Sequence, residues 1–85
     1  MSEETVHFDN AREAQDITGK RFEYLARIEE VLRVRLTARD TWLKAEGDPE
    51  KVGQALRFME ILRKARNAGI GLREHTVLFA LRTFQ

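Results

Sequence analysis

The feature that most constrains the fold is a change of hydrophobic period in the middle of the chain. In residues 33–39 (RVRLTAR), apolar side chains occupy every second position, and three of the polar positions are arginines. Residues 41–46 (TWLKAE) alternate in the same way after a short connection at Arg39-Asp40. Because successive side chains of a strand point to opposite faces, the alternation predicts two half-buried strands paired antiparallel.

The segments that flank these strands have helical spacing instead. From Phe22 to Leu32, apolar residues recur every three or four positions, which places them on one face of a helix. The stretch GDPEKV indicates a helix start, because Asp48 suits the N-cap and Pro49 suits the first helical position. We therefore predict four helices, at residues 10–18, 21–32, 49–67 and 72–83.

A short alternating run, TVHF, predicts a further strand at residues 5–8. The predicted order is then β-α-α-β-β-α-α, with the other strands at residues 33–39 and 41–46. Eighty-five residues make a single domain, 1–85, with one modest core. The economical arrangement is an α+β fold in which a three-stranded antiparallel sheet has helices packed on one face.

Composition narrows the class of protein. The chain has no cysteine, which excludes disulfides and thiolate metal sites and favours a reducing compartment. The N-terminus MSEETVHFDN is acidic and lacks the apolar segment of a secretory signal. No apolar run approaches the ~20 residues that a membrane span needs. We therefore predict a cytoplasmic protein with no membrane partner.

The sequence shows no pattern for catalysis or metal binding. His7 and His75 are the two histidines, and neither has Cys or carboxylate neighbours at the spacing of metal ligands. Glu29 and Glu30 are adjacent on a predicted helix and point apart, so they do not form an acid–base pair. The chain has no Gly-rich P-loop, nucleophile elbow or HExxH motif. We predict that this chain is not an enzyme and binds no metal or cofactor.

Charge is unevenly distributed, although the net charge is only +1. Residues 17–39 hold six basic residues against three acidic ones, whereas residues 1–16 hold one against five. A glycine before a helix lets the backbone approach a phosphate, the helix N-terminus favours anions, and Lys and Arg add phosphate contacts. The segment predicts a nucleic-acid-binding surface made of Gly19, Lys20, Arg21, Arg27, Arg33, Arg35 and Arg39.

A purely structural interpretation of the same residues is also open. Gly19 can serve only as the cap between two helices. The basic residues can then form a solvated face, because Glu23, Glu29 and Glu30 lie among them at spacings that allow ion pairs.

A second candidate surface is a partner interface. Trp42 alternates with Leu43 and Ala45, so it falls on the more exposed face of the predicted sheet, where it could stack on a base or contact another domain. Leu78 and Phe79 lie off the main apolar stripe of the last helix, which gives that helix more apolar surface than one face can bury. We predict that Trp42, Leu78 and Phe79 contact a partner.

The order β-α-α-β-β-α, with a glycine loop between the paired helices, resembles a type I KH domain. That family grips single-stranded nucleic acid with a GxxG loop. The matching stretch here is Gly19-Lys20-Arg21-Phe22, in which Phe22 stands in place of the second glycine. The resemblance therefore implies a grip that comes mainly from Lys20, Arg21 and the arginine-rich strand.

Residues 5 to about 82 also resemble the N-terminal domain of PhoH-like proteins, the ATP-binding family linked to phosphate starvation. The residues that carry this resemblance are Phe8-Asp9-Asn10, Gly19, Ile28-Glu29, Leu32 to Leu36, Arg39 and Gly47. In that family a P-loop ATPase domain follows, and the full protein is taken to act on RNA. No residue here matches a Walker motif, so ATP and Mg²⁺ would belong to an ATPase domain absent from this chain.

These observations lead to two expected functions. The first is a non-catalytic accessory domain of a PhoH-like ATPase that binds RNA or other single-stranded nucleic acid weakly through the basic loop and strand. The second is a protein-interaction module that docks on an ATPase domain or self-associates. The sequence is compatible with a natural protein of this length or with a piece of a longer one.

Overall fold

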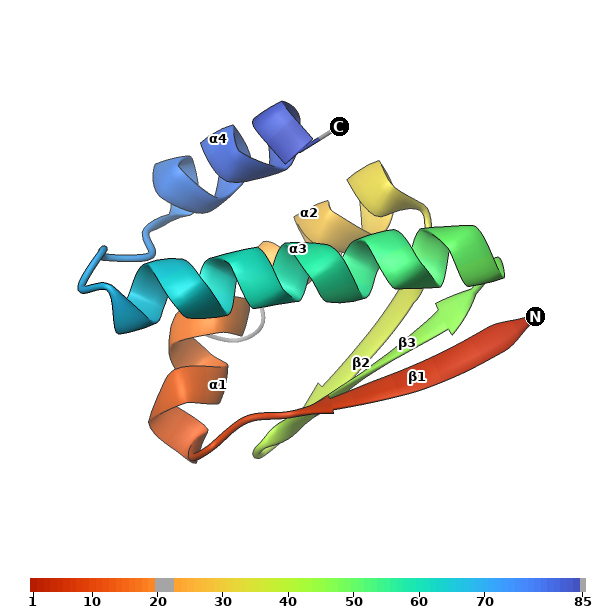
Figure 1. Ribbon diagram of the computed structural model, residues 1–85, viewed down its shortest axis with the longest axis horizontal. Coiled ribbons are helices and arrows are strands. Elements are labelled where there is room, and N and C mark those ends of the chain that lie inside the picture. Colours follow the sequence, from red (N-terminus) through yellow and green to blue (C-terminus); the bar gives the residue numbers. More distant parts are fainter. Residues whose placement is uncertain (20–22, 85) are drawn as a thin grey trace.

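The computed structural model describes residues 1–19 and 23–84. Its elements follow the predicted order β-α-α-β-β-α-α, which confirms the α+β class (Figure 1). They are β1 (Ser2–His7), α1 (Ala11–Thr18), α2 (Glu23–Leu32), β2 (Arg35–Arg39), β3 (Trp42–Gly47), α3 (Pro49–Asn67) and α4 (Glu74–Phe84).

The three strands form one antiparallel sheet in the spatial order β1-β3-β2. β3 pairs along its whole length with β1, from Ser2 opposite Gly47 to His7 opposite Trp42. On its other edge it pairs with β2, where Arg39 is also opposite Trp42. β1 begins three residues before the predicted start at residue 5. The reason is that its ladder with β3 continues into a polar stretch that shows no apolar alternation.

The helices pack on one face of this sheet (Figure 1). α3 lies across β1 and β3, α2 lies against β2, and α1 and α4 pack on these two helices. α3 is the central element, because it buries five apolar side chains, and each of the four larger ones contributes roughly 1.5–3 kcal/mol when removed from water. These are Val52, Ala55, Phe58, Met59 and Leu62. They meet Leu43 and Ala45 of the sheet in the core.

The turn after α1 requires a glycine. Gly19 has φ 83°, a left-handed conformation that other residues adopt at a cost, and its N–H donates to the carbonyl of Gln15 at 2.8 Å. A Cβ at this position would lie 2.8 Å from Cδ2 of Tyr24 and 2.8 Å from Cγ of Glu23. The first turn of α2 therefore packs so closely on Gly19 that no side chain fits there.

The junction between α2 and β2 differs from the predicted strand start at residue 33. Arg33 has φ 57°, and its N–H donates to the carbonyl of Glu29 at 2.8 Å. This left-handed residue ends α2, since it closes the last turn of the helix in the way a C-terminal glycine does. β2 therefore begins at Arg35, and its apolar residue Leu36 faces the helices.

Candidate nucleic-acid interface

The face of the sheet that points away from the helices is here called the open face. Because side chains alternate along a strand, residues adjacent to the buried Leu43 and Ala45 point to this face. The register assigns to it His7, Thr5 and Glu3 of β1, Trp42, Lys44 and Glu46 of β3, and Arg39, Thr37 and Arg35 of β2. All nine are exposed or half-buried, so solvent reaches the whole open face.

One end of the open face combines an aromatic residue with two ionisable ones. Trp42 lies opposite His7 on one side and opposite Arg39 on the other. Neighbouring strands are about 4.8 Å apart, so this row spans roughly 10 Å. An indole offers a flat π surface on which a nucleobase can stack, and a guanidinium can contact a phosphate. Trp42 is half-buried, so part of the residue stays accessible to solvent.

The other end of the open face is more acidic. Lys44 pairs with Glu46 at 3.7 Å, and Glu46 lies between Glu3 and Arg35 in the last row of the ladder. At the Trp42 end, the nearest acid in the sequence is Asp40, in the turn between β2 and β3. The acidic residues of the open face itself, Glu3 and Glu46, thus lie at the end away from Trp42.

The structure separates the predicted nucleic-acid-binding residues. Arg35 and Arg39 are exposed on the open face. Arg27 is exposed on α2, which belongs to the helical layer on the opposite side of the sheet. Arg33 lies in the turn between α2 and β2 and lines a cleft among the helices. Among the predicted binding residues that the structure describes, only the two arginines of β2 thus share a surface with Trp42.

Of the predicted loop residues, the structure describes Gly19. Gly19 is buried beneath Tyr24 and caps α1, so it forms the turn between the two helices. Its part in nucleic-acid binding stays a prediction. Lys20 and Arg21 lie outside the described residues, and their part in binding stays a prediction.

Glu29 has a backbone partner instead of a basic one. Its Oε2 accepts the N–H of Leu36 at 2.9 Å, on the edge strand of the sheet. Among residues 1–19 and 23–84, Glu23, Glu29 and Glu30 form no ion pair. The arginines of β2 are therefore not neutralised by the acids of α2, although the sequence allowed that arrangement. The Glu29 contact also occupies a free edge N–H that another strand could otherwise pair with.

A charged cluster that the sequence analysis missed joins α1 to α3. Glu13 is only 1% exposed, yet its Oε1 accepts the N–H of Asp9 at 2.9 Å and Nη2 of Arg63 at 3.1 Å. Nη1 of Arg66 lies 3.6 Å from its Oε2. Asn10 completes the arrangement, because its Oδ1 accepts the N–H of Glu13 at 2.8 Å. The spacing of Asn10 and Glu13 is that of a capping box, and this signal could have revealed the cluster.

The electrostatics of Glu13 indicate a structural role. Burial by itself raises the pKa of a carboxyl group, but the N–H of Asp9 and the guanidinium groups of Arg63 and Arg66 outweigh it and hold the pKa of Glu13 below its ordinary value of 4.5. The guanidinium of Arg63 also lies 5.8 Å from the centre of the Phe8 ring. Phe8-Asp9-Asn10, the first motif of the PhoH-like resemblance, thus helps to fix α1 against α3.

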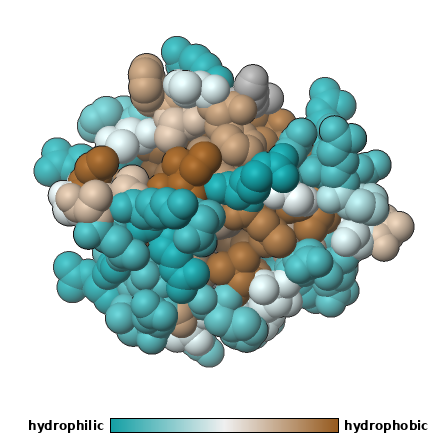
Figure 2. Space-filling view, viewed as in Figure 1, coloured by the Kyte–Doolittle hydropathy of each residue, from teal (hydrophilic) through white to brown (hydrophobic). Residues whose placement is uncertain are grey.

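The three predicted interface residues lie on two surfaces. Trp42 is on the open face, whereas Leu78 and Phe79 are on α4. Phe79 is 68% exposed, and with Leu78 and the neighbouring His75, Thr76 and Arg82 it lines a hollow of about 490 Å³. Figure 2 shows apolar surface in its upper half, in the region where Figure 1 places α4.

In comparisons with known proteins, no family model matches the chain and no curated protein is similar to it. The resemblances to KH and PhoH-like domains therefore stay predictions. Within the described part of the chain, no three His, Cys, Asp or Glu side chains are grouped to hold a metal ion. None of the helices in residues 1–19 and 23–84 is long and apolar enough to cross a lipid bilayer.

Proposed function

We propose that this protein is a non-catalytic module that binds single-stranded RNA at the Trp42 end of the open face. The observation that carries the proposal is the row His7–Trp42–Arg39, in which an accessible indole lies between an imidazole and a guanidinium. Following the resemblance to PhoH-like proteins, the module serves an RNA-acting ATPase whose P-loop domain is not in this chain.

The expected affinity is low. Stacking of one base on an aromatic side chain contributes about 1–3 kcal/mol, and one charge-assisted contact to phosphate adds about 1.5–3 kcal/mol. Together they correspond to a Kd between about ten millimolar and tens of micromolar. A module of this strength increases the affinity of a larger RNA-binding assembly by raising the effective concentration of RNA.

The chain contains one tryptophan, so its fluorescence reports directly on the proposed contact. Titration with a short single-stranded RNA should quench the emission of Trp42, because a stacked base removes its exposed ring face from water. The apparent affinity should fall as salt rises, since phosphate contacts release counterions. Unchanged Trp42 emission at low salt, over an RNA range that reaches millimolar, would show that the indole is not the contact.

Matched variants separate this contact from general electrostatic attraction. In an anisotropy assay with labelled RNA, Trp42→Leu and Arg39→Gln should each weaken binding. Arg73→Gln removes the same charge from an exposed residue on the helical side and should leave binding nearly unchanged. Equal losses for Arg39→Gln and Arg73→Gln would contradict a local site on the open face.

A second candidate function is protein interaction through α4, either with an ATPase domain or with a second copy of this chain. The observation that favours it is the exposed ring of Phe79 beside the half-buried Leu78, whereas Val77 and Leu81 of the same helix are buried in the core. Exposed aromatic side chains are common at the centres of protein interfaces.

Sedimentation of the isolated chain tests the self-association arm. We expect the mass to rise with concentration and Phe79→Ser to return it to the monomer. Ile61→Ser is the control, because Ile61 is an exposed apolar residue on α3. A strictly monomeric chain that also fails to bind a PhoH-type ATPase domain would eliminate this function.

A further inference from the structure

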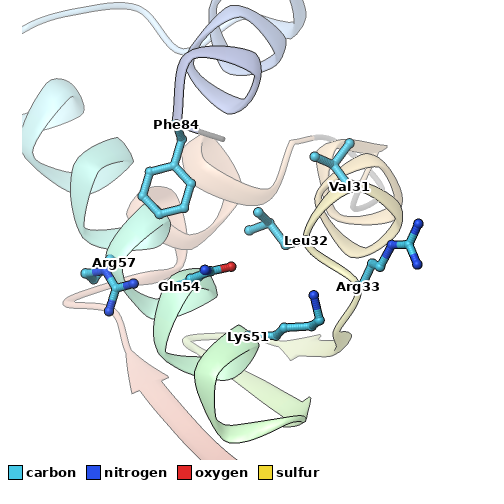
Figure 3. Close-up of a pocket in the computed structure, with 7 residues that line it drawn as sticks. All are labelled: Val31, Leu32, Arg33, Lys51, Gln54, Arg57 and Phe84. Atoms are coloured by element: carbon cyan, nitrogen blue, oxygen red, sulfur yellow. The ribbon is translucent and has the colours of Figure 1, made fainter.

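A cleft opens in the helical layer, on the side of the sheet opposite to the open face. It lies between the end of α2, the first half of α3 and the last turn of α4, and has a volume of about 630 Å³ (Figure 3). Its lining consists of Val31, Leu32, Arg33, Lys51, Gln54, Arg57 and Phe84. This volume falls within the roughly 300–1,000 Å³ of small-molecule sites.

The polar part of this lining carries positive charge only. Among the residues that the structure describes, Arg33, Lys51 and Arg57 of the lining are basic, Gln54 is neutral, and no carboxylate lines the cleft. In the described ranges, none of the three basic residues forms an ion pair. Arg63, farther along α3, is by contrast paired with acidic residues. α3 thus holds Arg63, which is paired with acidic residues, together with Lys51 and Arg57, which form no ion pair with any residue that the structure describes.

The backbone of Arg33 supports a role for its charge. Arg33 ends α2 at φ 57°, whereas glycines occupy the left-handed positions after α1 and α3, at Gly19 with φ 83° and Gly69 with φ 90°. Glycine adopts this conformation at a lower cost than arginine. A guanidinium therefore stands at the rim of the cleft at a position whose backbone conformation glycine adopts at a lower cost.

Figure 3 shows how these side chains are arranged. The Lys51 amine and the Gln54 amide point toward the middle of the cleft, while Arg33 and Arg57 stand on opposite sides of it. Leu32 and Phe84 form an apolar wall. The ring of Phe84 is held in place by a tilted contact with Phe58, at 5.4 Å between centroids. The Lys51 amine thus faces the same cavity as the apolar wall, whereas the Arg33 guanidinium points outward from its rim.

We propose that this cleft binds the phosphate monoester of a nucleotide. Lys51 would contact the phosphate, Arg57 and Arg33 at the two edges would add to the positive potential of the cleft, and the base would pack against Phe84 and Leu32. A monoester is a dianion near neutral pH, so it matches three cations better than the singly charged diester of a strand interior. The ligand is either a free mononucleotide or the 5′-phosphorylated end of a strand, because both present the same group. The site is separate from the open face.

The first test compares AMP with its two fragments, adenosine and inorganic phosphate, by NMR titration of backbone amides in the full chain. We expect AMP to bind roughly tenfold or more tightly than either fragment, since only AMP engages the cations and the apolar wall together. The shifts should include the amides of Leu32 and Gln54. Equal affinity for AMP and either fragment, or unshifted Leu32 and Gln54, overturns the proposal.

The two sources of the monoester are separated in the Trp42→Leu variant, which removes the proposed contact on the open face. A preference of this variant for 5′-phosphorylated over 5′-hydroxyl RNA assigns the site to strand ends. Binding of AMP without that preference assigns it to free mononucleotides. Either result is independent of whether Trp42 binds RNA in the wild-type chain.

Two double variants test whether the basic residues of the cleft bind AMP. Lys51→Met with Arg57→Gln should lower the affinity for AMP roughly tenfold or more. Lys64→Met with Arg73→Gln removes equal charge from exposed positions outside the cleft and should leave it unchanged. Equal losses in the two pairs overturn the proposal.

Arg33→Gly separates a role of Arg33 in binding from a purely structural role, because the two roles predict different changes in affinity for AMP. This variant should unfold at a higher temperature than the wild-type chain, because glycine suits φ 57° better, yet bind AMP several-fold more weakly. Unchanged affinity for AMP in a well-folded Arg33→Gly variant overturns the role of this arginine in the site.

Discussion

Nη2 of Arg63 lies 3.1 Å from Oε1 of Glu13, although the two residues are 50 positions apart in the chain. The same guanidinium donates to the carbonyl of His7 at 2.9 Å. One arginine of α3 therefore holds both the end of β1 and the first turn of α1. A buried carboxylate is tolerated here because its Oε1 accepts two hydrogen bonds and its Oε2 lies 3.6 Å from the guanidinium of Arg66.

Glu13→Gln should destabilise the fold by about 1–3 kcal/mol, because it weakens charge-assisted hydrogen bonds in a buried position. Urea denaturation followed by circular dichroism measures this change. Glu60→Gln is the matched control, since Glu60 is 53% exposed on the side chain and lies 4.0 Å from the same arginine. Its effect should stay below about 1 kcal/mol. Equal effects of the two substitutions would show that burial of Glu13 is not what matters.

The same carboxylate predicts a pH dependence. The pKa of Glu13 is lower in the folded chain than its ordinary value of 4.5. The unfolded chain therefore binds more protons between the two values, and the contribution to stability is complete above 4.5 and is lost as pH falls through the folded pKa. The difference in stability between wild type and Glu13→Gln should shrink as pH decreases below 4.5. A difference that stays constant from pH 7 to pH 3 contradicts the lowered pKa.

Gly19→Ala should destabilise the fold by about 1–3 kcal/mol, because φ 83° is unfavourable for alanine and the added Cβ meets Tyr24 at 2.8 Å. Gly71→Ala is the control, since a Cβ at Gly71 meets nothing within 4 Å. That change should be neutral or stabilising by up to about 1 kcal/mol. Thermal unfolding of the two variants measures the contrast, and similar midpoints would contradict the tight packing of Tyr24 on the turn.

Charge reversal distinguishes the predicted loop from the open face. If the loop holds RNA, Lys20→Glu with Arg21→Glu should abolish binding and leave the fold intact. If the open face holds RNA, Arg35→Glu with Arg39→Glu should abolish binding and leave the fold intact, because both arginines lie on the open face with Trp42. Anisotropy with labelled single-stranded RNA measures both pairs at one salt concentration. If the Lys20→Glu, Arg21→Glu variant still binds RNA, the loop serves only as a turn between two helices.

Local patterns in the sequence were sufficient for the order of elements. Alternation in residues 33–46 indicated the two strands, and Asp48 marked the start of α3, where its side chain accepts the N–H of Glu50 at 2.9 Å. The predicted start of β2, at residue 33, was wrong by two positions, because the strand begins at Arg35. The reason is that Arg33 belongs to the alternating pattern but closes the last turn of the preceding helix.

The sequence by itself determined which side chains share one face of a strand, because a strand has a fixed period of two. It therefore placed Arg35 and Arg39 together on β2 and Trp42 on the solvent-facing side of β3. Only the tertiary structure decided that His7 joins Trp42, since the order β1-β3-β2 and its register depend on contacts between distant segments. The same packing of α2, α3 and α4 brought Arg33, Lys51 and Arg57 to one cleft. No local sequence pattern predicts that these three residues lie close together. Their proximity arises when separate helices bury their apolar faces against one sheet.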